Sequence, residues 1–128
     1  MSHIARGTFE VEIIPSVPEL GGAVNRFELR KSFSGDLSGT GSGVMLSGGD
    51  PSTGTAGYVA METVRGALGG REGAFALQQF GTMISGVATL HYQVVPGSGS
   101  GGLAGLQGTL HLTIEADGTH RFALEYDL

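Results

Sequence analysis

The stretch LAGLQGTLHLTIEA, residues 103–116, decides how this chain folds. It follows a glycine-rich segment in which Gly97, Gly99 and Gly102 have the G-x-G-x-x-G spacing of dinucleotide-binding loops. Such a loop binds phosphate where it lies between a strand and a helix, because the helix N-terminus supplies the N–H groups and the dipole. From Leu106 onward, however, apolar and polar side chains alternate with a period of two, which predicts a second strand. We therefore do not interpret the glycine motif as a nucleotide site.

The composition indicates a single domain, residues 1–128, without disulfides or thiolate metal sites. The chain has no cysteine, and its 7 basic and 12 acidic side chains give a formal net charge of −5. The six arginines and one lysine are scattered, so nucleic acid and anionic membranes are poor candidate partners. The N-terminal residues lack a signal-peptide pattern, and no apolar run is long enough to span a bilayer. We expect a soluble, cytoplasmic protein.

Hydrophobic periodicity predicts an all-β fold. Of the residues, 40% are hydrophobic, and they fall in eight runs that are separated by turn residues and lack helical periodicity. The 24 glycines are interspersed among these runs, so we place them inside structure. The first run ends at a segment that contains Pro15 and Pro18, residues that stop a ladder. The eight predicted strands are Gly7–Ile14, Val24–Ser34, Asp36–Ser47, Ala56–Leu68, Ala74–Phe80, Ile84–Val95, Ala104–Glu115 and His120–Asp127.

Eight strands in up-and-down order, each with one apolar face, hide their edges when they close into a barrel. The second and third strands form one continuous alternation, in which Gly35, Gly39, Gly41 and Gly43 fall on the inward face. Glycine there permits the strong coiling of a small barrel, or leaves lumen volume for a ligand. We predict a closed eight-stranded antiparallel up-and-down β-barrel. An open sandwich of the same strands is the structural alternative, since strand spacing alone does not distinguish the two.

The last two strands form a predicted hairpin with a defined register. Residues 117–119, Asp-Gly-Thr, fit a three-residue loop with glycine in the left-handed position. This loop places Ile114 opposite Phe122 and Glu115 opposite Arg121. The register is self-consistent, because apolar side chains face each other and opposite charges meet.

Five segments, which together cover nearly the whole chain, carry a family resemblance. They are GTFEV at Gly7–Val11, FSGDLSGTG at Phe33–Gly41, GALGGREGAFALQ at Gly66–Gln78, VVPGSGSGGLAGLQG at Val94–Gly108 and LEYDL at Leu124–Leu128. In this combination the chain resembles a small bacterial family of unknown function, domain of unknown function 3224. That family is assigned to the allene oxide cyclase-like, calycin-like barrels, and a more distant likeness extends to plant allene oxide cyclases and dirigent proteins.

The resemblance implies a fold and a type of ligand more strongly than a reaction. These relatives are eight-stranded barrels that hold an apolar, reactive small molecule in the lumen, and the plant members tend to form trimers. We therefore expect a small apolar molecule as partner and a homo-oligomer, either a dimer or a trimer. Barrels of this kind also serve as plain binding proteins, so the fold does not fix the function.

Polar residues on the inward faces form the candidate lumen site, because a ligand pocket needs a few polar groups on an apolar wall. Lys31 is a candidate to bind a carboxylate or carbonyl, or to act as an amine of lowered pKa. Alternatively, its stem packs while its head group reaches water at the barrel mouth. Glu62 is a candidate general base or stabiliser of positive charge if its face of the strand points inward. If Met61 points inward instead, Glu62 is a solvated residue, and the sequence leaves this open.

The remaining candidate ligand-binding residues carry amide and hydroxyl groups. Gln79 lies on the apolar face of its strand and offers an amide to a bound carbonyl, or is simply paired with backbone. In the resembling family this position is commonly histidine, so a histidine base there does not apply to this chain. Tyr58 shares its face with Glu62, and Tyr92 and Tyr126 fall on inward phases, although core tyrosines with one polar tip are frequent.

Metal and cofactor chemistry have little support. Outward-facing His91 and His111 lie on neighbouring strands, and the predicted register places Glu125 opposite His111. Two imidazoles at loose spacing are a weak signal for zinc, so we predict no metal and no other cofactor. The favoured hypothesis is a barrel that binds a small apolar molecule, with Glu62 as the candidate catalytic residue of a cyclase or isomerase acting by confinement. The alternative is a non-catalytic binding or structural protein with a filled barrel.

Overall fold

Residues 2–16 and 23–128, the part of the chain that this computed structural model describes, form nine β-strands and no α-helix. The all-β prediction is confirmed. The predicted proline turn after the first strand lies partly in residues 17–22, outside the described residues. The strands are β1 (Ser2–Pro15), β2 (Val24–Gly35), β3 (Leu37–Asp50), β4 (Thr55–Leu68), β5 (Arg71–Ile84), β6 (Val87–Val94), β7 (Ser100–Gly101), β8 (Gln107–Ile114) and β9 (His120–Asp127), and a 3₁₀ turn, η1 (Pro51–Thr53), follows β3. No helix within these described ranges is long and apolar enough to cross a membrane.

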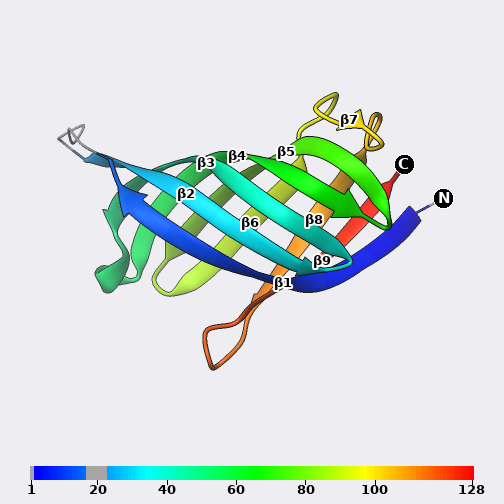
Figure 1. Cartoon of the computed structure of the whole chain (residues 1–128). Helices are drawn as coiled ribbons and strands as arrows, with labels where there is room; N and C mark the ends of the chain where they lie inside the picture. Colours follow the sequence, from blue (N-terminus) through cyan, green and yellow to red (C-terminus); the bar gives the residue numbers. More distant parts are fainter. Residues whose placement is uncertain (1, 17–22) are drawn as a thin grey trace.

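The eight long strands close into a barrel. Hydrogen-bonded neighbours follow the order β4-β3-β2-β1-β9-β8-β6-β5, and β4 pairs in turn with β5. All of these pairings are antiparallel, and β1 lies beside β9, so the two chain ends meet at the same end of the barrel (Figure 1). The two-residue strand β7 adds to the start of β5. The predicted closed barrel is confirmed and the open sandwich is wrong.

The barrel end that holds the two termini is filled with apolar side chains. Phe33 from β2, Phe75 from β5 and Phe122 from β9 are each at most 3% exposed there. Their burial removes water from a continuous apolar core, the main favourable term in folding. The buried members of this core are Ala5, Phe9, Phe33, Leu37, Val64, Leu68, Phe75, Leu77, Tyr92, Val94, Leu103, Leu106, Leu110, Phe122 and Leu124.

The glycine-rich segment before β8 closes this end of the barrel. Leu103 and Leu106 project from it into the core and are 0% and 1% exposed. The backbone turns instead of extending, because the Leu103 N–H donates to Ser100 O at 3.1 Å and the Leu106 N–H donates to Leu103 O at 3.1 Å. Gly105, with φ +85°, adopts the left-handed conformation that this turn requires. Residues 103–106 therefore form a plug that closes this end of the barrel, although residues 104–106 were predicted as the start of a strand. The glycine motif leads into neither a nucleotide loop nor a helix.

Strand β5 is longer than predicted at both ends. It begins directly after the two-residue turn Gly69–Gly70 and continues to Ile84, where Ser85–Gly86 makes a second two-residue turn. All four turn residues have positive φ, as hairpin turns between twisted strands require. Ile84 thus ends β5 and does not begin β6 as predicted, because β5 continues through Gly81 in register with β4.

The hairpin between β8 and β9 has a different register from the predicted one. Gly118, with φ +90°, is the last residue of the loop, so the loop comprises residues 116–118, one position earlier than predicted. As a result Phe122 pairs with Leu112, Arg121 with Thr113 and His120 with Ile114. The Arg121 side chain still reaches the Glu115 carboxylate, at 2.8 Å, across the turn.

Candidate functional site

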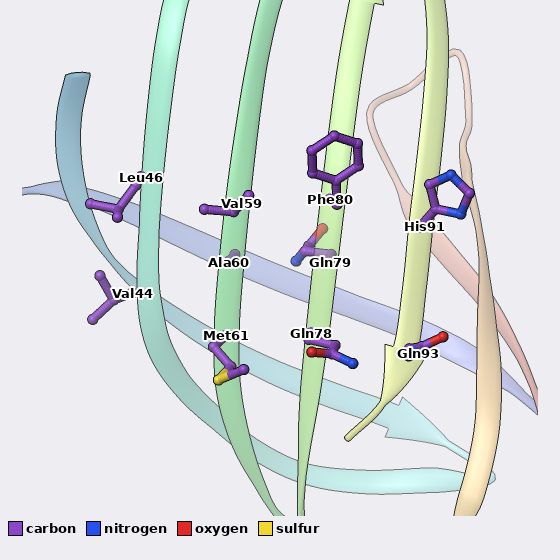
Figure 2. A pocket seen from close by; sticks show the side chains of 10 residues that line it. All are labelled: Val44, Leu46, Val59, Ala60, Met61, Gln78, Gln79, Phe80, His91 and Gln93. Atoms are coloured by element: carbon purple, nitrogen blue, oxygen red, sulfur yellow. The ribbon is translucent and has the colours of Figure 1, made fainter. Parts of the chain in front are cut away.

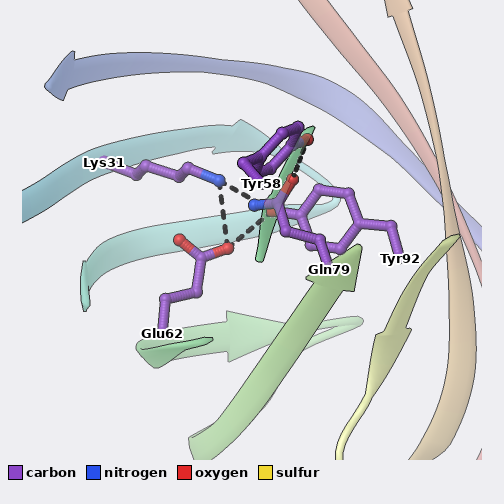
Figure 3. A network of polar contacts seen from close by, with 5 residues as sticks. All are labelled: Lys31, Tyr58, Glu62, Gln79 and Tyr92. Atoms are coloured by element: carbon purple, nitrogen blue, oxygen red, sulfur yellow. Dashed lines mark hydrogen bonds and ion pairs between the residues drawn. The ribbon is translucent and has the colours of Figure 1, made fainter. Parts of the chain in front are cut away.

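Five polar side chains meet inside the barrel, above the apolar core. They come from four strands, and each of them was predicted as a site residue. The continuous alternation through β4 points the Glu62 face inward and leaves Met61 55% exposed, which resolves the question the sequence left open. The five residues are Lys31 from β2, Tyr58 and Glu62 from β4, Gln79 from β5 and Tyr92 from β6 (Figure 3).

Lys31, Glu62 and Tyr92 form a buried hydrogen-bonded triad. The Lys31 ammonium donates to Glu62 Oε1 at 3.0 Å and to the Tyr92 hydroxyl at 2.7 Å, and the Tyr92 hydroxyl donates to the same carboxylate oxygen at 2.5 Å. The Lys31 and Glu62 side chains are only 4% and 1% exposed. Lys31 therefore does not reach water. Buried charges of this kind need a partner, because desolvation of an isolated ion costs several kcal/mol.

Burial in the barrel favours the neutral forms of the Lys31 and Tyr92 side chains. Burial lowers the pKa of Lys31 below its usual value, although the Glu62 carboxylate acts in the other direction. Burial, together with the Glu62 carboxylate, raises the pKa of Tyr92 well above 10.0. The rings of Phe9 and Tyr92 face the ammonium with centroids at 4.6 and 5.1 Å from Nζ, which partly replaces the lost hydration.

A glycine on the neighbouring strand lies against the Phe33 ring and beside the Glu62 carboxylate. Gly41 lies opposite Lys31 in the β2–β3 register, and a Cβ there would come within 3.2 Å of the Phe33 ring and 3.7 Å of Glu62 Oε2. That second carboxylate oxygen is buried and has no hydrogen-bond partner within the part of the chain that the structure describes. Glu62 therefore keeps one oxygen engaged and one with capacity to accept a proton or a hydrogen bond.

Tyr58 and Gln79 form a second polar pair beside the triad. The Tyr58 hydroxyl donates to Gln79 Oε1 at 2.8 Å, so Gln79 is paired with a side chain and retains its amide NH₂ as a donor. Gly81, the register partner of Tyr58 on β5, has no side chain and so leaves space for the tyrosine ring, which would contact any Cβ there. Burial raises the pKa of Tyr58.

The barrel half above these groups is hollow. A cavity of about 220 Å³ lies over the polar cluster, and a wider one of about 460 Å³ occupies the mouth at the end opposite the termini. Four residues, Met45, Tyr58, Leu112 and Ile114, line both, so the two spaces adjoin, and we refer to them together as the funnel. The inner cavity is lined by Phe9, Val11, Ile13, Leu29, Lys31, Met45, Tyr58, Gln79, Tyr92, Leu112, Ile114 and His120. Its floor is polar and its walls are mostly apolar.

Glu62 lies behind this floor. Lys31 and Tyr92, which do line the cavity, separate the carboxylate from the open space. The sequence analysis missed His120, which lines the cavity from β9 and packs against the Phe9 ring with centroids 5.0 Å apart and the ring planes tilted by 36°. His120 lies on the inward face of its strand together with Phe122. The alternation that predicted inward-facing tyrosines therefore also predicts an inward-facing His120.

The structure does not bring the remaining candidates to this cluster. Tyr126 lies at the end of β9 near the termini, packed on the ring of His3 with centroids 5.2 Å apart. His91 faces outward beside Phe80. His111 Nε2 lies 3.2 Å from the Glu125 carboxylate, as a diagonal contact since the register differs from the predicted one. Among the described residues, no three histidine, cysteine, aspartate or glutamate side chains are grouped to hold a metal ion.

Comparisons with known proteins agree with this fold and give no activity. The family model "Protein of unknown function (DUF3224)" matches residues 5–126. A crystal structure of a DUF3224 protein of unknown function from Shewanella oneidensis MR-1 is 40% identical in sequence and superimposes with a TM-score of 0.90 over 100% of this chain and 98% of that chain. No curated protein matches this chain. The chain belongs to the DUF3224 family, as the sequence segments predicted.

Proposed function

We propose that the barrel binds a small, mostly apolar molecule in the hollow half of its lumen. The observation that carries the proposal is the funnel, whose apolar walls end on a floor of hydrogen-bonding groups. Ligand pockets have this composition, since apolar contact supplies affinity and a few polar groups fix orientation. A purely structural barrel has no need of a buried ion pair, which contributes little net stability compared with apolar side chains of the same volume.

The polar floor favours a ligand with a neutral carbonyl group. Lys31 and Gln79 present N–H donors at the cavity, which suits an acceptor oxygen. A carboxylate ligand is less suitable, because Glu62 already balances the charge of Lys31 at 3.0 Å and a second carboxylate would enter a dry site without its own cation. We infer an aldehyde, ketone or enone with an aliphatic body as the ligand class.

As an enzyme, the barrel would act by confinement and proton transfer. The apolar wall would hold a reactive substrate near its product geometry, as cyclisation or isomerisation requires. Glu62 would accept or return a proton through Lys31 or Tyr92, because these two groups stand between it and the cavity. A carrier without turnover is the second candidate, and Glu62→Gln distinguishes them: the variant keeps ligand binding in both cases but abolishes turnover only in an enzyme.

The binding proposal is tested with N-phenyl-1-naphthylamine, a neutral apolar molecule that fluoresces in a dry environment. We expect saturable fluorescence with wild type, and loss of it in Met45→Trp, which fills the funnel where the inner and outer cavities meet. Thr63→Trp is the matched control, since this threonine is exposed on the outer face of the adjacent strand β4 and lies outside the cluster of exposed apolar side chains on β3–β5. Equal fluorescence from the two tryptophan variants, or none from wild type, would contradict the proposal.

The expected homo-oligomer is a separate proposal, and an apolar patch on the outer wall supports it. The outward side chains Val44, Leu46, Val59, Met61 and Phe80 lie next to one another on β3, β4 and β5, each between 37% and 55% exposed (Figure 2). Gln78, His91 and Gln93 continue this surface on β5 and β6, and no aspartate, glutamate, lysine or arginine of the described residues lines it.

We propose that a second copy of the chain covers this patch. The chain carries a net charge of −5, so two copies repel each other over most of their surface, but an uncharged face avoids this repulsion. An isologous contact would place apolar side chains on apolar side chains and amides on amides. Light scattering after size exclusion is expected to give at least twice the 13.1 kDa of one chain, and Phe80→Glu is expected to give a monomer. A monomeric wild type would refute this interface.

A further inference from the structure

We propose that Lys31 is an imine-forming residue, which reacts through its amine with small aliphatic aldehydes that enter the lumen. This inference rests on the proposed function, because the aldehyde must first occupy the funnel. It adds a covalent step to that binding and assigns the step to one atom, Lys31 Nζ. The same groups that make the floor of the cavity polar make this atom reactive.

The geometry places the amine at the cavity and away from bulk water. Lys31 lines the inner cavity of about 220 Å³ while its side chain is only 4% exposed. Two hydrogen bonds, to Glu62 and to Tyr92, and two aromatic rings hold Nζ in place. A fixed amine that faces an apolar cavity is pre-organised to attack a carbonyl carbon, because less rotational freedom is lost in reaching the attack geometry.

The proton that blocks the amine has an acceptor at hydrogen-bond distance. An ammonium has no lone pair for attack, so Lys31 must first lose a proton, and Glu62 Oε1 lies 3.0 Å away. Transfer of that proton converts two buried charges into two neutral groups, which a dry environment favours. Burial lowers the pKa of Lys31 in the same direction. The other titratable groups that face the amine are the Tyr92 hydroxyl from β6 and, along the cavity wall, Tyr58 from β4 and His120 from β9.

The reaction balances without a further reagent. The Nζ lone pair forms a bond to the aldehyde carbon while the C=O π electrons move to oxygen, and a proton passes from nitrogen to that oxygen to give a carbinolamine. The hydroxyl then takes the proton held by Glu62, by way of the Tyr92 hydroxyl bonded to it, and leaves as water as the C=N bond forms. The products are one water and a protonated imine on Lys31, paired with the Glu62 carboxylate. The Gln79 amide NH₂ is available to hold the carbonyl oxygen during attack.

The chain offers an unusually clean test, since Lys31 is its only lysine. The protein is incubated with hexanal and sodium cyanoborohydride near neutral pH, and peptide mass spectrometry locates the hexyl groups. Arg65→Lys adds an exposed lysine on the outer face of β4 as an internal reference. We expect Lys31 to be labelled at least about tenfold faster than the introduced lysine, because its amine is held at the cavity that hexanal enters and has a proton acceptor at 3.0 Å. Glu62→Gln is expected to slow this labelling at the loss of water, because the amide has no proton to give to the leaving hydroxyl and no charge to pair with the protonated imine.

A polar aldehyde and the fluorescent probe serve as two controls, which separate failure of the imine inference from failure of the binding proposal. Glyceraldehyde, a small polar aldehyde with no affinity for an apolar funnel, is expected to label the introduced lysine in preference to Lys31. N-Phenyl-1-naphthylamine fluorescence is recorded on the same samples, with Lys31→Arg as a variant that keeps the positive charge but forms no imine. If the fluorescent probe binds and hexanal leaves Lys31 unlabelled, the imine inference is wrong and the binding proposal stands. If the probe does not bind and Lys31 is also not labelled, both fail.

Discussion

Glu62→Leu is expected to be among the most destabilising single substitutions in the barrel. It removes the carboxylate that lies 3.0 Å from the Lys31 ammonium, in a site where the two side chains are 4% and 1% exposed. The variant leaves an unpaired buried ammonium, which costs about 3–5 kcal/mol. The exposed pair of Arg121 and Glu115 makes a matched control, because its atoms lie closer, at 2.8 Å, but its side chains are 56% and 40% exposed. Glu115→Gln is expected to cost less than about 1 kcal/mol.

A double-mutant cycle separates the loss of the pair from the loss of packing. Lys31→Met alone leaves a buried carboxylate and is expected to destabilise by a similar amount, whereas Lys31→Met with Glu62→Leu removes both charges and fills the space with apolar atoms. The free energy of unfolding of the double variant is expected to lie within about 1 kcal/mol of the wild-type value or above it. Because each single variant loses about 3–5 kcal/mol, the coupling energy is then at least about 5 kcal/mol. Urea denaturation followed by circular dichroism gives the four free energies. Additive single effects would refute the view that the pair is isolated from water.

The pH dependence provides a check on the same variant. In Glu62→Leu the pKa of Lys31 is lowered by burial with no carboxylate to oppose it, while the unfolded chain keeps a value near 10.5. The unfolded state then binds more protons between these two values, so the free energy of unfolding rises with pH in that window. The difference in free energy of unfolding between wild type and Glu62→Leu should therefore become smaller as the pH approaches about 9.5. A difference in free energy of unfolding that does not change with pH would mean that the Lys31 ammonium remains solvated in the variant.

Three further substitutions test the parts of the barrel that build the site. Leu103→Ala, in the plug, is expected to lower the free energy of unfolding by about 2–5 kcal/mol in urea denaturation, because a side chain with 0% exposure leaves a cavity; a loss below about 1 kcal/mol would contradict the plug. Gly41→Val is expected to lower the free energy of unfolding by about 1–3 kcal/mol, because a Cβ there meets the Phe33 ring at 3.2 Å and the added methyl groups extend toward the Glu62 carboxylate. Unchanged stability would show that the barrel wall accommodates a larger side chain at this position. Gly81→Val is expected to displace the Tyr58 ring and weaken N-phenyl-1-naphthylamine binding, and fluorescence equal to wild type would contradict the role given to Gly81.

Alternation along the strands predicted much of the fold and most of the site. Because side chains in a strand point alternately to its two faces, the series through Phe33, Leu37 and Gly41 placed Lys31 inside the barrel from sequence alone. The same rule placed Gln79 and Tyr92 on the inward faces of their strands. It did not choose a face for Glu62, since neither face of that strand is purely apolar. Closure of the barrel decides that question, and closure depends on contacts among all strands.

The errors in the sequence analysis come from glycine. Gly105 turns the chain with a positive φ, although the apolar and polar residues around it keep a strand-like pattern, so the plug was predicted as part of a strand. Gly81 has the opposite effect, because it lies inside a continuous strand where a tyrosine ring covers it, but it resembles a break. Gly118 fixes the last loop one residue earlier than predicted and shifts the register by two. Sequence pattern alone does not distinguish a glycine that turns the chain from one that makes room for a neighbour.

The hollow half of the lumen could not be predicted from the sequence, because an empty volume leaves no pattern of residues. The sequence predicted inward glycines, which are compatible with either a filled or a ligand-sized interior. The structure has both conditions in one barrel: leucine and phenylalanine side chains fill the end with the termini, and a funnel remains at the other end. The division between the two halves lies at Lys31, Glu62 and Tyr92.

A crystal structure of the protein with N-phenyl-1-naphthylamine tests the central claim most directly. The account predicts electron density for the probe in the funnel, in contact with Met45 and Leu112 and above the floor formed by Gln79 and Lys31. Density for the probe on the outer face of β3–β5 alone, or a lumen closed by side chains down to the level of Lys31, would contradict it.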